Sequence, residues 1–143
     1  LDTVPMADLV DSIGAVVREV TPDVLLLPYR GDAHSDHTVV FDAAAACAKS
    51  FRYPSVKGVY AYETLSETEF GLRPDDSGFR PNLFINIADH LDAKIAIMRL
   101  FASELGEFPF PRSETAIRAQ AQLRGTQAGS TAAEAFIILR EIR

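Results

Sequence analysis

The feature that most constrains the fold of this sequence is a short apolar run, Val24 to Leu27, between two segments of helical periodicity. In the first segment, Met6 to Val20, apolar residues recur every three or four positions, as they do on one face of an amphipathic helix. The same spacing returns from His37 to Phe51. A strand that is apolar on both faces is typical of a parallel strand buried between layers of helices. The first fifty or so residues of the chain therefore predict a helix, a strand and a second helix, the alternation found in α/β proteins.

The rest of the chain continues this alternation. Further strands are predicted at 56–64, 82–87 and 135–139, and further helices at 89–105 and from a Ser113 cap to about Arg124, where Gly125 is expected to end the helix. The segment 65–81 mixes polar and aromatic residues, and we expect an ordered loop or lid that sets ligand selectivity. The sequence therefore predicts one α/β domain over residues 1–143, with ligands beyond the carboxyl ends of its strands.

Composition narrows the kinds of partner. Hydrophobic residues make up 48% of the chain and charged residues 24%, a globular balance, and the net charge of -6 argues against nucleic acid or an anionic membrane as the main partner. No apolar run approaches the roughly 18–20 residues that a membrane-spanning helix needs. The single cysteine, Cys47, is expected to be a small core residue, and with no secretory pattern at the N-terminus it favours the cytoplasm. Small molecules are the expected ligands.

The residues best suited to chemistry follow the first strand, where an α/β protein places its site. His34, Asp36 and His37 fall within four positions at the predicted start of a helix. Such a cluster can offer one imidazole as a ligand, a second imidazole for proton or charge work, and a carboxylate that orients a ring. The positive end of a helix also disfavours imidazolium, and this favours the neutral form of His37 that a metal requires.

A structural interpretation of the same residues stays open. Ser35 or Asp36 can be a helix cap and His37 a half-buried packing residue, because this spacing is common at helix starts. Arg30 and Asp32 are candidate substrate contacts, and the alternative is that both stabilise the loop. The acidic residues of the 65–81 segment, Glu67 among them, are expected to be solvated.

Five stretches of the chain together resemble one protein family. They are PDVLLLPYRGDAHSDHTVVFDAA (22–44), YETLSETEF (62–70), FRPNLFINI (79–87), LRGTQAG (123–129) and AEAFIILREI (133–142). With the His-x-Asp-His motif in the first stretch, they resemble the later part of the LmbE-like, PIG-L type de-N-acetylases. The resemblance extends over nearly the whole chain.

The resemblance implies a Rossmann-like α/β fold, with a mostly parallel sheet flanked by helices, and a zinc ion that assists hydrolysis of the N-acetyl group on N-acetylglucosamine-type sugars. It implies that His37 is a zinc ligand, that His34 stabilises the developing oxyanion, and that Asp36 orients His34. Zinc would polarise the amide carbonyl and acidify a bound water, while an imidazolium offsets the charge of the tetrahedral intermediate. The expected partner is then an N-acetylated amino sugar.

One part of the family's pattern is missing. In this family an Ala-His-Pro-Asp-Asp-Glu motif after the first strand supplies two more zinc ligands and the general base, and no part of residues 1–143 resembles it. A catalytic zinc needs about three protein ligands. We therefore expect the carboxyl-side portion of a de-N-acetylase, inactive alone, with a sheet incomplete at its N-terminal side whose open edge would favour homo-oligomers. The alternative is a non-catalytic α/β module that binds a ligand or partner and has lost the metal site.

Overall fold

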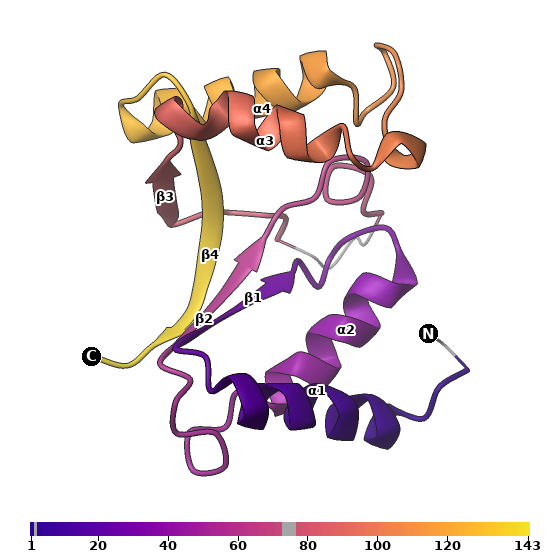
Figure 1. Cartoon of the computed structure of the whole chain (residues 1–143), viewed down its shortest axis with the longest axis vertical. Helices are drawn as coiled ribbons and strands as arrows, with labels where there is room; N and C mark the ends of the chain where they lie inside the picture. The colour runs from indigo at the N-terminus through magenta and orange to yellow at the C-terminus, as the bar shows by residue number, and fades with distance from the viewer. Residues whose placement is uncertain (2, 73–76) are drawn as a thin grey trace. The chain divides into compact units, whose positions relative to one another are not determined.

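The computed structural model describes residues 1, 3–72 and 77–143 (Figure 1). Its helices and strands are α1 (Met6–Val20), β1 (Val24–Pro28), α2 (Ser35–Ala46), β2 (Gly58–Tyr62), β3 (Leu83–Asn86), α3 (Leu91–Met98), α4 (Glu114–Ala128) and β4 (Ala133–Glu141), with short 3-10 helices at Ala88–His90 and Ala102–Glu104. The chain divides into two compact units, one made of Leu1–Arg80 and Phe136–Arg143 and the other of Pro81–Ala135. Among the described residues, no helix is long and apolar enough to cross a membrane.

The first unit has its core where α1 and α2 pack against β1 and β2. The helix predicted from Met6 to Val20 is confirmed residue for residue as α1. The core cluster takes side chains from each of these elements and from the turn before β2: Val17, Leu27, Ala44, Cys47, Ala48, Tyr53, Val56 and Val59. Cys47 is fully buried, which confirms its expected place in the core. This packing fixes the end of β1 and the start of α2, the junction that carries the His-x-Asp-His motif.

The strands form one sheet in the order β1-β2-β4-β3. β1 and β2 are parallel, with Val24 opposite Gly58, whereas β2 and β4 are antiparallel, with Tyr62 opposite Phe136. The sheet is mostly not parallel, so the expectation of a mostly parallel sheet was wrong. The apolar character of a strand reports its burial and not its direction, and the pattern of the last strand therefore could not show that it runs opposite to β2.

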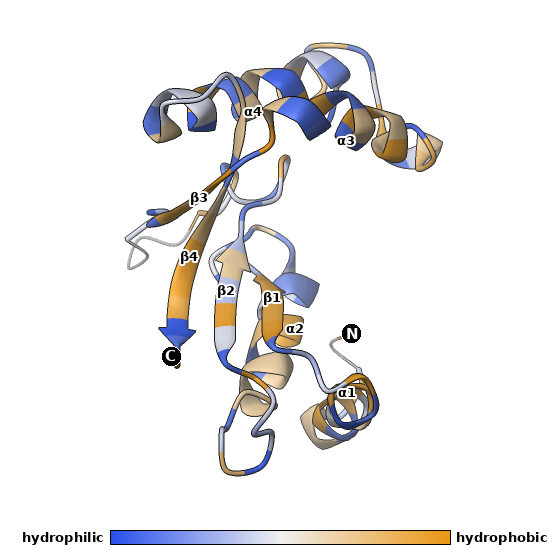
Figure 2. Ribbon diagram, turned by 60° about the vertical axis from the view of Figure 1, so that its left-hand side comes forward, coloured by the Kyte–Doolittle hydropathy of each residue, from blue (hydrophilic) through white to orange (hydrophobic). Residues whose placement is uncertain are grey.

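β1 is also less buried than its sequence predicts. It is apolar along its length (Figure 2), yet Leu26 is 55% exposed and Val24 41% exposed. In the strand order β1 pairs only with β2, so it is an edge strand of the described sheet. The prediction of burial on both faces was wrong at this strand, because the run of apolar residues does not specify how many layers cover it.

The second unit packs β3, α3 and α4 around a small cluster of Ile87, Ala121 and Ala132. Ser113 caps α4 as predicted, since its hydroxyl accepts a hydrogen bond of 3.2 Å from the backbone N–H of Ala116. Two boundaries differ from the prediction. The helix expected at 89–105 is shorter and ends at Met98, and α4 continues through Gly125 to Ala128, with Gly129 in the left-handed conformation (φ 68°) as its stop.

Candidate functional site

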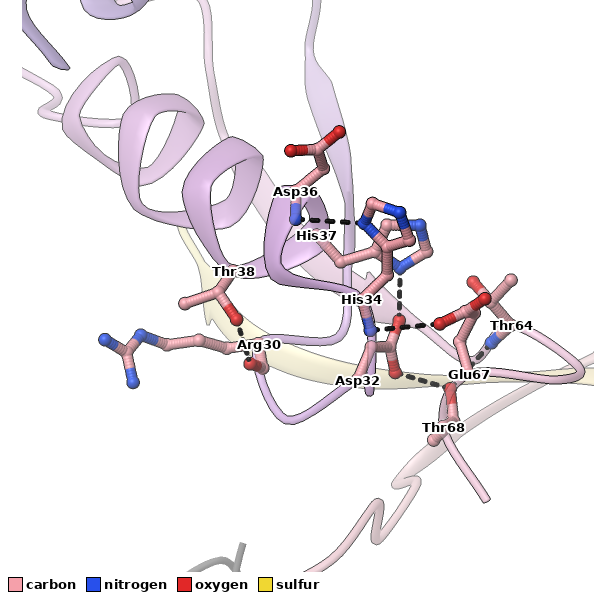
Figure 3. Close-up of polar contacts among 9 residues, drawn as sticks. All are labelled: Arg30, Asp32, His34, Asp36, His37, Thr38, Thr64, Glu67 and Thr68. Atoms are coloured by element: carbon pink, nitrogen blue, oxygen red, sulfur yellow. Dashed lines mark hydrogen bonds and ion pairs between the residues drawn. The ribbon is translucent and has the colours of Figure 1, made fainter. Parts of the chain in front are cut away.

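The candidate site lies in the loop between β1 and α2 and in the first turn of that helix (Figure 3). Pro28 ends β1 and Ser35 begins α2. His34 is the residue that caps the helix, because its Nδ1 accepts a hydrogen bond of 3.1 Å from the backbone N–H of Asp36. The cap is thus neither Ser35 nor Asp36, the two residues that the structural interpretation of the motif offered.

A short contact in the site joins Asp32 and His37. Oδ2 of Asp32 lies 2.6 Å from Nδ1 of His37, and Oδ1 accepts a hydrogen bond of 2.6 Å from the hydroxyl of Thr68. The Asp32 side chain is fully buried, whereas 28% of the His37 side chain is exposed. Burial raises the pKa of the Asp32 carboxyl above its ordinary value, and the hydrogen bonds with His37 and Thr68 oppose that rise. The carboxylate that contacts an imidazole in this structure therefore belongs to Asp32.

A turn from the loop after β2 completes the site. The carboxylate of Glu67 accepts a hydrogen bond of 3.0 Å from the backbone N–H of His34, and the carbonyl of Glu67 accepts one of 3.0 Å from Ala33. Thr68 accepts a hydrogen bond of 2.8 Å from the N–H of Thr64. Glu67 was expected to be solvated, and neither Glu67 nor Thr68 was a predicted site residue. This turn lies within the stretch from Tyr62 to Phe70, one of the five stretches that resemble the family. That resemblance is the sequence signal that could have identified the turn.

Two predicted site residues have other contacts. The contact of Asp36 with His34 is made by its backbone N–H and not by its side chain. Arg30 makes two hydrogen bonds to the carboxylate of Asp42, at 2.8 and 3.1 Å, on the exposed side of α2. The orienting role of Asp36 and the substrate contacts of Arg30 and Asp32 stay predictions, although a buried Asp32 with both oxygens engaged favours a positioning role.

The hydrogen bonds assign complementary tautomers to the two neutral rings. Nδ1 of His34 accepts a hydrogen bond from the backbone N–H of Asp36, so a neutral His34 carries its own proton on Nε2. Nδ1 of His37 faces a carboxylate, so a neutral His37 carries its proton on Nδ1 and keeps a lone pair on Nε2. The ring centroids are 6.0 Å apart. The pair can therefore present a hydrogen-bond donor and a nitrogen ligand side by side.

The described residues supply one such ligand but not a whole metal site. Among residues 1, 3–72 and 77–143, no group of three or more His, Cys, Asp or Glu side chains could hold a metal ion. A catalytic zinc takes about three protein ligands. The lone pair on Nε2 of His37 fits one of them, and the described part of the chain does not complete the set.

Comparison with known proteins relates the chain to several solved structures, among them the two that follow. No protein-family model matches it, and no curated protein does either. The conserved protein TT1542 from Thermus thermophilus superimposes with a TM-score of 0.70 and 22% identity, over 98% of this chain and 61% of that one. The N,N'-diacetylchitobiose deacetylase from Pyrococcus horikoshii, complexed with its inhibitor MPG, gives a TM-score of 0.73 and 17% identity, over 96% and 54%. The chain shares the α/β fold of these structures and spans about three fifths or less of their length.

Proposed function

We propose that this chain is the carboxyl-side portion of a zinc-dependent de-N-acetylase that hydrolyses the N-acetyl amide of an amino sugar. The observation that carries the proposal is the pair of complementary imidazoles, His34 and His37, at the β1–α2 junction of a fold shared with a chitobiose deacetylase. The family resemblance of the sequence supports the same chemistry. Zinc dependence, the sugar substrate and a cytoplasmic location are all parts of the proposal.

In this proposal His34 stabilises charge. Attack on an amide carbonyl places negative charge on its oxygen, and a donor fixed in advance at that position lowers the barrier. The backbone N–H of Asp36 occupies Nδ1 of His34, so Nε2 is the nitrogen that donates to the oxyanion. Removing one such donor typically costs about 10²–10³ in rate.

His37 has the other role, that of one zinc ligand through Nε2. Because the described residues do not complete a metal site, the role of this chain in the proposal is to supply that one ligand and the oxyanion donor. The remaining ligands and the general base would come from outside the described residues. The 143-residue chain alone is accordingly proposed to be inactive.

The test is acetate release from N-acetylglucosamine and N,N'-diacetylchitobiose by the full-length protein that carries this chain. We expect His37→Ala to abolish turnover and His34→Ala to lower it by about 10²–10³. His90→Ala is the matched control, because Asp89–His90 repeats the Asp-His pair before another helix and is exposed there. Turnover that survives His37→Ala, or a protein that releases no acetate, would overturn the proposal.

A second candidate function rests on the missing ligand cluster. A non-catalytic α/β module that had lost its metal site would also lack a complete set of metal ligands among these described residues. Such a module binds a ligand or partner without turnover. Full-length protein that holds no zinc and releases no acetate, but binds the sugar, would favour this candidate.

A further inference from the structure

Among the described residues of the first unit, Asp32 is the polar residue that is buried. Its side chain is fully buried, and each of its carboxylate oxygens has a short contact, one with His37 and one with Thr68. Burying a carboxylate costs free energy unless hydrogen bonds compensate it. A loop that needed only to be stable could fill this position with an apolar side chain at less cost. The two partners, His37 and Thr68, therefore indicate why a carboxylate occupies this position.

We propose that Asp32 is a positioning residue that acts through His37. It holds the proton of a neutral His37 on Nδ1 and so directs the Nε2 lone pair away from the loop. The inference deepens the proposed function and rests on it, because a fixed Nε2 lone pair is useful only if His37 binds a metal or a proton there. Asp32 itself is not expected to touch the substrate.

The second oxygen of Asp32 extends this role to the turn at Thr64–Thr68. Thr68 donates to Asp32 and accepts from the backbone of Thr64, which makes Asp32 the link between the turn and His37. The same turn holds the backbone N–H of His34 through the Glu67 carboxylate. A Cβ at Gly71 would collide with the carbonyl oxygen of Gly31, so the two loops are closely apposed here. The turn thus contacts His34 directly and His37 through Asp32. Asp32 is the residue that sets the tautomer of His37.

The test is the ring-nitrogen NMR spectrum of the 143-residue chain labelled with ¹⁵N-histidine, at a pH where the rings are neutral. The chain has three histidines, so the spectrum resolves into three ring systems and His90 serves as the internal reference. We expect His37 protonated on Nδ1 and His34 protonated on Nε2. A wild-type His37 that carries its proton on Nε2 would overturn the inference without any variant.

Two variants separate positioning from simple stability. Asp32→Ala is expected to abolish the preference of His37 for the Nδ1 proton, while the His90 signals keep their shifts. Thr68→Val removes the other contact of Asp32 and is expected to leave the His37 tautomer unchanged. If Asp32→Ala does not fold, Asp32→Asn keeps the side-chain volume, and it too is expected to weaken the preference. A folded Asp32→Ala with an unchanged His37 tautomer would contradict the inference.

In the full-length protein, the same substitution has a second readout. Losing the partner of a metal-bound histidine typically costs about ten- to a hundred-fold in metal affinity or activity. We expect Asp32→Asn to lower zinc affinity by that factor and to lower kcat more than it raises KM. Because the tautomer measurement needs neither metal nor substrate, its outcome is independent of acetate release. A failed proposed function and a failed inference are therefore distinguishable.

Discussion

The glycine at position 125 lies on the face of α4 that meets the backbone of residues 130–132. A Cβ at this position would stand 2.6 Å from the carbonyl oxygen of Ser130 and 2.8 Å from the backbone nitrogen of Ala132. Real Cβ atoms do not approach backbone atoms this closely, so the turn after α4 can lie where it does only if residue 125 lacks a side chain. Gly129 has a different reason, because its positive φ of 68° favours glycine in an open position.

We expect Gly125→Ala to destabilise the protein by about 1–3 kcal/mol, because the extra methyl group must push the 130–132 backbone away. Urea unfolding followed by circular dichroism measures the change. Gln122→Ala, at an exposed position of the same helix, is the control and should stay within about 0.5 kcal/mol of wild type. Equal stability of Gly125→Ala and wild type would show that the turn moves at no cost.

Sequence patterns predicted the local half of the candidate site and missed the distant half. His34, Asp36 and His37 lie within one helical turn, so their spacing alone places them together at the start of α2. Glu67 and Thr68 reach the site across more than thirty residues, and no local period encodes such a contact. The same limit explains Gly125: a glycine that permits close packing and a glycine that ends a helix are identical in the sequence.

At the scale of elements, the start of α4 is held by a network of exposed charges. Glu114, in the first turn, accepts from Arg99 at 2.5 Å and from Arg118 at 3.0 Å. Arg118 also contacts Asp92, in the first turn of α3, at 2.9 Å. Hydrogen bonds from Arg99 and Arg118 hold the pKa of the Glu114 carboxyl below its ordinary value of 4.5. An acidic residue in the first helical turn also interacts favourably with the helix dipole.

The lowered pKa of Glu114 determines in which direction the stability of the protein changes with pH. A carboxyl whose folded pKa is depressed stabilises the protein above its unfolded pKa, and the contribution disappears as the pH falls through the folded pKa. We expect Glu114→Gln to be less stable than wild type at pH 7 and to approach wild type as the pH falls below about 4.5. Urea unfolding at a series of pH values measures this, with Glu107→Gln, at an exposed loop position, as the control. A difference that is constant with pH would contradict the account.

Helices were predicted correctly where the helical spacing of their apolar residues was long and regular. α1 has fifteen residues of uninterrupted helical spacing and was predicted at both ends, and the helix from Ser113 was correct at its capped start. The segment at 89–105 has a similar apolar content but splits into 3-10 and α-helical pieces. The direction of β4 and the exposure of β1 depend on which strands lie beside them, so the pattern of a single strand could not predict either.

At the scale of the whole molecule, the candidate site follows β1, an edge strand of the described sheet, in an α/β fold that the chain shares with solved structures. The net charge of -6 suits a small-molecule ligand better than a polyanion. The chain spans 61% and 54% of the two solved structures it resembles. One candidate ligand, His37, lies among its described residues, and a complete metal site needs more. The central claim is therefore that His37 is a zinc ligand of the full-length protein.

The measurement that tests this claim most directly is the zinc content of the full-length protein, determined by elemental analysis beside its His37→Ala and His90→Ala variants. We expect one zinc per chain in wild type and in His90→Ala, and none in His37→Ala. The 143-residue chain alone is expected to retain no stoichiometric zinc, because its described residues do not complete a ligand set. Zinc that stays bound after His37→Ala, or a wild-type protein that holds none, would contradict the account.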